Sequence, residues 1–172
     1  MPTIRLVTEL WAPIGRCFDL ARSVDLHAAS MAHTGERAVA GRTTGLVERG
    51  ETVTWEARHF GVRQRLTSRI TDVEAPVFFA DEMVPRRECG HGAFRSFRHE
   101  HRFEAVRGEE DPGGALTRMT DVFAFESPLG VVGRVVNGAY LTRYMRRLLE
   151  HRNRALREAL EGGEWRRYLG GA

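Results

Sequence analysis

The segment 97–106, FRHEHRFEAV, decides the fold because its side chains alternate in kind at every position through residue 104. Arginine and glutamate occupy one face of this segment. The opposite face is predicted to hold Phe97, His99, His101 and Phe103. Successive side chains of a β-strand point to opposite faces, so the pattern predicts a strand whose sheet is covered on one face and in water on the other.

The same alternation recurs along the chain and predicts a curved antiparallel sheet of about seven strands. The predicted strands or extended segments span residues 3–10, 35–41, 51–60, 62–73, 77–84, 93–106 and 116–125. For 77–84, either choice of facing places apolar and acidic side chains on both faces, so the facing of this strand is left open.

Helical spacing appears in two places, directly after the first predicted strand and after the last one. Residues 14–22 and 24–31 are predicted to form two short helices directly after the first strand. A long amphipathic helix then closes the chain, with Ser127 as its N-cap, Pro128 in its first turn and Gly162-Gly163 at its end. A single helix laid across a curved sheet leaves a hollow between the two layers, which is typical of ligand binding.

Composition narrows the class of protein. The chain of 172 residues fits one domain, expected over 1–162, with a C-terminal tail over 163–172 that is loose unless Trp165 and Tyr168 dock on the body. All 26 basic residues are arginine and the net charge is +3, but no basic stripe with interleaved aromatics indicates nucleic-acid binding. The two cysteines form no CxxC motif, and no signal peptide or apolar run of about 20 residues is present. A cytoplasmic protein without stable membrane insertion is therefore expected.

Three stretches resemble the START-like (SRPBCC) superfamily, which includes Bet v 1-like proteins and bacterial polyketide cyclase/dehydrase-like proteins. They are WAPIGRCFDLA at 11–21, the pair FRHEHRFEAV at 97–106 and TRMTDVFAFESPLG at 117–130, and GVVGRVVNGAYL at 130–141. The resemblance covers about residues 3–161. It implies the α+β helix-grip fold and a cavity between sheet and last helix that takes a hydrophobic or amphipathic small molecule.

The candidate ligand-binding residues are those on the inferred inner faces of the strands and on the apolar stripe of the last helix. They are Trp55, His59, Gln64, Leu66, Ser68, Phe97, His99, His101, Phe103, Met119, Asp121, Phe123, Leu141 and Met145. A buried polar side chain without a partner costs about 1–3 kcal/mol. The polar members of this set therefore indicate either local hydrogen bonds or a cavity that holds water or a ligand.

His99, His101 and Asp121 are the candidates for acid–base chemistry. Two histidines two positions apart on a strand point the same way, and Asp121 on the next strand could fix one imidazole tautomer. Structural pairing of these side chains is the simpler interpretation. No metal and no cofactor are predicted, because two imidazoles need a third ligand and none lies near in sequence.

Three functions remain open from the sequence. The first is a binding or carrier protein for a lipid, polyketide, isoprenoid or similar molecule. The second is a cyclase, aromatase or dehydratase that uses the same cavity, so whether the chain is an enzyme is left undecided. The third is an interaction module that meets a protein partner through a sheet edge or an arginine-rich face.

Overall fold

The computed structural model describes residues 1–59, 61–84, 94–126 and 133–170, and the side chains of all of these except residues 59 and 133–138. The strands form one antiparallel sheet in the order β1-β7-β6-β5-β4-β3-β2. They are β1 (Thr3–Leu10), β2 (Arg37–Gly41), β3 (Thr52–His59), β4 (Val62–Glu74), β5 (Phe78–Met83), β6 (Ser96–Arg107) and β7 (Leu116–Glu126). The first strand therefore pairs with the last, and the other neighbours follow in chain order.

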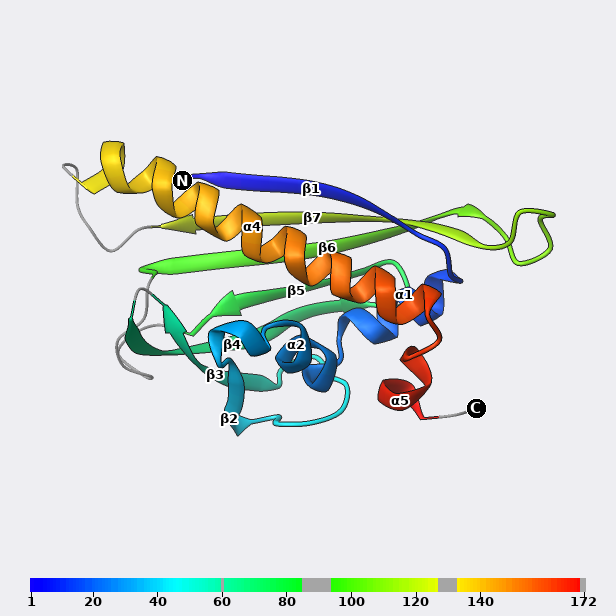
Figure 1. Ribbon diagram of the computed structural model, residues 1–172, viewed down its shortest axis with the longest axis horizontal. Helices are drawn as coiled ribbons and strands as arrows, with labels where there is room; N and C mark the ends of the chain where they lie inside the picture. Colours follow the sequence, from blue (N-terminus) through cyan, green and yellow to red (C-terminus); the bar gives the residue numbers. More distant parts are fainter. Residues whose placement is uncertain (60, 85–93, 127–132, 171–172) are drawn as a thin grey trace.

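One long helix, α4 (Gly133–Glu161), runs diagonally across one face of the curved sheet (Figure 1). The residues of α4 that face the strands are buried or half-buried: Leu141, Met145, Leu149, Asn153, Leu156 and Leu160. Their spacing of three and four residues gives a helix a single covered face. No helix in the described ranges has the length and hydropathy to cross a membrane.

Shorter helices pack beside α4 on the same side of the sheet (Figure 1). They are α1 (Ile14–Ala21), α2 (Val24–Ser30), the 3-10 turn η1 (Ala32–Thr34) and α5 (Trp165–Leu169). Trp165 and Tyr168 pack against the core beside α1, and the guanidinium of Arg16 lies 4.1 Å from the centre of the Trp165 ring. The segment after α4 is thus docked on the body up to Leu169.

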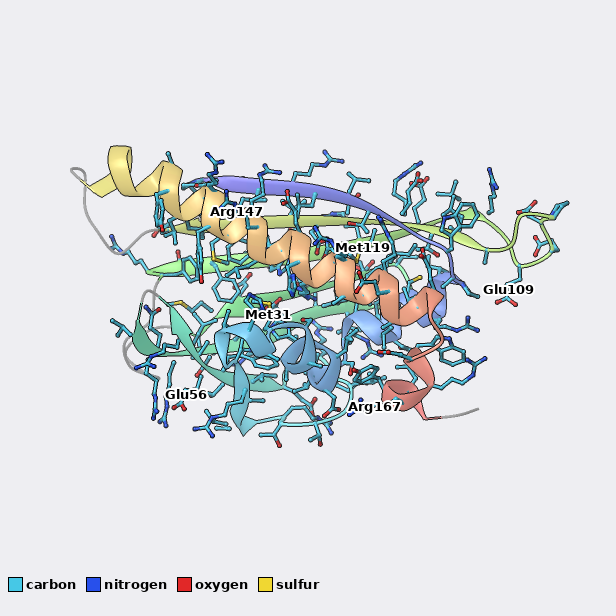
Figure 2. All side chains as sticks on the ribbon, in the orientation of Figure 1. Met31, Glu56, Glu109, Met119, Arg147 and Arg167 are labelled. Carbon is cyan, nitrogen blue, oxygen red and sulfur yellow. The ribbon has the colours of Figure 1, made fainter. Side chains whose placement is uncertain are left out.

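The cores at the two ends of α4 differ in their members. We name the first the solid end: its buried residues are Leu10, Ala12, Cys17, Phe18, Leu20, Leu26, Phe79, Phe103, Met119, Leu156, Ala159 and Leu160. The second cluster, around Ile4, Phe97, Phe123, Phe125 and Leu149, lies beneath the N-terminal half of α4. The side chains that fill the space between sheet and helix are drawn in Figure 2, where Met119 is labelled under α4.

The α+β helix-grip architecture predicted from the sequence is confirmed. Burial alternates along β6 and β7 as expected, with Phe97, His99, His101 and Phe103 buried and Arg102 and Glu104 exposed. The strand with undecided facing is resolved by its register, because Phe79 lies opposite His101 and Asp81 lies opposite His99. Phe79, Asp81 and Met83 therefore share the covered face. The predicted cap Ser127 and the predicted first-turn Pro128 lie outside the described residues.

Candidate functional site

A hollow with two lobes lies between the sheet and the helices α2 and α4. The larger lobe measures about 150 Å³ and the smaller about 80 Å³. Both lobes are bordered by six residues, which we name the junction: His27, Trp55, Ser68, Asp81, His99 and Arg152. Because they share this wall, the two lobes adjoin each other.

The larger lobe is mainly apolar. Beyond the junction its walls are formed by Met31, Glu36, Leu66, Phe94, Phe97, Phe123, Leu141, Tyr144, Met145, Leu148 and Leu149. Phe97 and Phe123 stack with their ring centres 5.4 Å apart and form the floor on β6 and β7. An apolar cavity of about 150 Å³ is large enough to hold one benzene molecule. The lobe therefore matches one small ring or a short branched chain.

The smaller lobe is more polar and reaches toward α1 and α2. Beyond the junction it touches His101, Phe79, Arg22, Ser23 and several apolar residues of β3, β4 and the α2 region. Phe79 stacks on the imidazole of His101 with ring centres 4.2 Å apart. This stacking fixes the plane of the His101 ring.

Behind this wall, polar side chains form a buried network. Asp121 Oδ1 lies 3.1 Å from His99 Nε2 and 2.7 Å from His101 Nδ1. The first contact has hydrogen-bond geometry, whereas the second is close in distance but poorly aligned. Asn153 Nδ2 of α4 donates to Asp121 Oδ2 at 2.6 Å and lies 3.1 Å from the hydroxyl of Thr8. The network therefore connects β1, β6, β7 and α4.

The pKa values of the side chains of Asp81, His101 and Asp121 shift in different directions. Desolvation raises the pKa of Asp81, although His99, Arg152 and a hydrogen bond from Ser68 oppose it. Desolvation holds the pKa of His101 well below its usual value, although Asp121 opposes this shift. Burial alone would raise the pKa of Asp121, but the interactions with His101 and His99 outweigh it and hold this pKa well below its usual range.

Two more polar side chains, His27 and Arg152, border the hollow from the helical side. His27 Nε2 lies 2.6 Å from Glu36 Oε1, and the His27 ring packs on Trp55 with centres 4.2 Å apart. Arg152 reaches in from α4 and donates one hydrogen bond, of 3.4 Å, to the carbonyl of Ala21. Among the described residues, no carboxylate lies within ion-pair distance of Arg152. Its guanidinium is thus a cation at the cavity wall with spare donors.

The structure distributes the sequence-derived candidates among several places. Trp55, Leu66, Ser68, Phe97, His99, Phe123, Leu141 and Met145 border the larger lobe, and His101 borders the smaller one. Asp121 lies behind the wall. Phe103 and Met119 lie in the solid end. Gln64 borders a smaller pocket of about 60 Å³, which shares Glu36, Trp55, Leu66 and Phe94 with the larger lobe. The side chain of His59 lies outside the described residues.

Several residues of the hollow were not among those candidates: Asp81, His27, Glu36, Arg152, Tyr144, Met31, Phe94, Leu148 and Leu149. Arg152 and the network residue Asn153 could be identified from the sequence, since both are polar residues on the apolar stripe of α4 between Leu149 and Leu156. A polar residue in such a stripe is expected to have a buried partner or a ligand. Asp81 had no comparable signal, because the facing of its strand was undecided.

Comparisons with known proteins leave the family open and agree on the fold. No family model and no curated protein matches the chain. Solved structures do match: TTHA0849 from Thermus thermophilus is 18% identical with a TM-score of 0.69, over 94% of this chain and 99% of that one. Zhui aromatase/cyclase from Streptomyces sp. R1128 is 15% identical with a TM-score of 0.61, over 99% of both chains. Ara h 8.0201 is 14% identical with a TM-score of 0.55, over 94% of this chain and 98% of that one. At these identities the likeness shows the helix-grip fold alone.

Proposed function

We propose that the chain binds a small amphipathic molecule in the two-lobed hollow, with its apolar part in the larger lobe and a polar group at the junction. The observation that carries the proposal is the division of one hollow into an aromatic-lined lobe and a wall that bears Asp81, His99 and the spare donors of Arg152. Pockets of this composition, mostly apolar with a few converging polar groups, are the usual sites for small ligands.

The size of the hollow narrows the ligand class within this proposal. A lobe of about 150 Å³ takes one ring, and the adjoining lobe of about 80 Å³ adds room for a short substituent. A ring compound or a compact isoprenoid therefore fits better than a long acyl or poly-ketone chain. Each buried methylene-sized group contributes about 0.8 kcal/mol before association costs. An affinity in the micromolar range, about −8 kcal/mol, is expected.

Native mass spectrometry of the purified protein tests whether a ligand is carried. A bound molecule appears as a mass above that of the chain and is identified after denaturation. Toluene, phenol and benzoate are then titrated in ligand-detected NMR, and phenol and benzoate are expected to bind more tightly than toluene because they offer an oxygen to Arg152.

A matched pair of α4 variants locates the binding. Leu148→Phe narrows the larger lobe and is expected to abolish binding of all three compounds, whereas Ala159→Leu, in the solid end, is expected to leave it unchanged. A bare chain that binds none of the compounds would refute the proposal. So would equal binding by Leu148→Phe and the wild type.

A reaction in the same hollow is the second candidate function. Asp81 and His99 favour it, since both border the two lobes and would touch the polar group of a bound carbonyl compound. A cyclase, aromatase or dehydratase would return a changed molecule, whereas a carrier returns its ligand intact. Incubation with small diketones followed by mass analysis separates the two. A product that forms with the wild type and not with Asp81→Asn supports the enzyme.

A further inference from the structure

Asp81, His99 and His101 bring one carboxylate and two imidazoles to a single point of the covered sheet face. Asp81 lies directly opposite His99 in the β5–β6 register, and His101 follows two residues later on the same face. One possible ligand atom from each of the three lies within 4.8 Å of the others. No third ligand lies near His99 and His101 in the sequence, but Asp81 on the neighbouring strand β5 provides one in the fold.

Both imidazoles lie beside a second carboxylate, that of Asp121. Asp121 Oδ1 contacts Nε2 of His99 and Nδ1 of His101, and Asn153 holds the other oxygen of Asp121. The other nitrogen of each ring, Nδ1 of His99 and Nε2 of His101, is not engaged by Asp121. A carboxylate behind each ligating histidine is the usual outer arrangement of a metal site, because it orients the ring and selects its tautomer.

We propose that Asp81, His99 and His101 bind one divalent first-row transition metal ion, of which Zn²⁺ is the simplest case. Two imidazoles and a carboxylate form a ligand set that suits Zn²⁺, Fe²⁺, Co²⁺ and Ni²⁺. Metal–ligand distances of about 2.1 Å require ligand atoms about 3.4 Å apart, so the three atoms close by about 1.4 Å at most on binding. Asp81 is half-buried at the hollow, where its side chain has room to make this move.

The proposed ion would keep an open position toward the hollow. Three protein ligands leave at least one coordination site, as in metal centres that bind a substrate. The carboxylates of Asp81 and Asp121 together balance the charge of the ion. Arg152 adds a further positive charge at the same wall, so the open position favours an oxygen ligand that is neutral or anionic.

The experiment titrates Co²⁺ into chelator-treated protein without any organic ligand and follows the visible absorption of the bound ion. One equivalent is expected to bind, and Zn²⁺ is expected to displace it and to raise the melting temperature. Asp81→Asn, of nearly the same shape, is expected to weaken binding by more than about 100-fold, and Asp121→Asn by about 10–100-fold. His99→Asn serves as a second ligand variant, and thermal melting verifies that each variant folds.

The control removes a different pair of histidines. His33 and His151 are exposed with ring centres 4.6 Å apart, and such a surface pair can take up metal by itself. The double variant His33→Gln, His151→Gln is expected to bind Co²⁺ as tightly as the wild type. The proposal is overturned if the wild type binds no Co²⁺, if Asp81→Asn and His99→Asn bind it equally well, or if the control loses it. Because no organic ligand is present, failure here leaves the proposed binding of an amphipathic molecule standing.

Discussion

The two ends of the space under α4 share one sheet and one helix, yet one is solid and the other is hollow. At the solid end α1 inserts Cys17, Phe18 and Leu20 between the strands and the C-terminal half of α4. Beneath the N-terminal half, α2 stands at the rim with His27 and Met31, and the space between Trp55 and Met145 stays open. The difference teaches that the hollow depends on where the short helices lie, since the same alternating strands run under both ends.

The largest expected effect comes from truncating a large side chain at each end. Phe18 is fully buried with its ring centre 5.8 Å from that of Phe79 and 5.7 Å from that of Phe103. Phe18→Ala is expected to lower the free energy of unfolding by about 3–5 kcal/mol, because it leaves an enclosed void. Met145→Ala is expected to cost about 1 kcal/mol, since Met145 already borders open space. Urea unfolding measures both, and equal losses would mean that the hollow end is as tightly packed as the solid end.

The buried thiol of Cys17 makes the stability of the solid end depend on pH. Burial raises the pKa of Cys17 to about 11, from an ordinary value of 9.0. The unfolded chain therefore ionises first, so stability is intact below about pH 9 and falls as the pH rises toward 11, by about 2–3 kcal/mol in all.

Urea unfolding at about pH 8 and about pH 10.5 measures this loss against Cys17→Ala, which removes the thiol. The variant is expected to start less stable and to lose less stability between the two pH values. Parallel losses in the two proteins would mean that the Cys17 thiolate is as well accommodated in the folded chain as in water.

Larger side chains on α4 are also expected to change stability differently at the two ends, with a loss at the solid end and none at the hollow end. Ala159 is buried in the solid end, so Ala159→Leu is expected to destabilise by about 1–3 kcal/mol through overpacking. Leu148 borders the larger lobe, so Leu148→Phe fills existing space and is expected to be neutral or to stabilise by up to about 1 kcal/mol. Thermal melting compares the two variants, and a large loss for Leu148→Phe would show that the lobe has no room for the added ring.

The architecture was predictable from sequence because the period of each element is local. Alternation along β6 and β7 and the stripe of α4 need no tertiary information, and both are confirmed. The facing of β5 was not predictable, since FFADEM carries an acid in either register and only pairing with β6 turns Asp81 inward. Whether an inner side chain borders the hollow was equally out of reach: Phe103 and Phe97 look alike in β6, but only Phe97 escapes the cover of α1.

The smallest expected effect concerns the outer face of β3, directly behind Trp55. Glu56 is only 4% exposed because the guanidinium groups of Arg37 and Arg65, themselves mostly in water, lie over it at 2.7 and 2.9 Å. Hydrogen bonds from Arg37 and Arg65 lower the pKa of Glu56 to about 2, from 4.5. A lowered carboxyl pKa stabilises the fold above about pH 4.5, and this contribution is lost as the pH falls toward 2.

Glu56→Gln should therefore lower the melting temperature slightly at about pH 6, and the difference from the wild type should shrink as the pH falls to about 2.5. Added salt should also reduce this difference in melting temperature, because these ion pairs are on the surface. In amide hydrogen exchange at about pH 6, the faster exchange in the variant should be confined to β2, β3 and β4, with the solid end unchanged. Equal acceleration at the solid end would mean that the sheet responds as one unit, and the hollow would then be a local void in a uniformly stable fold.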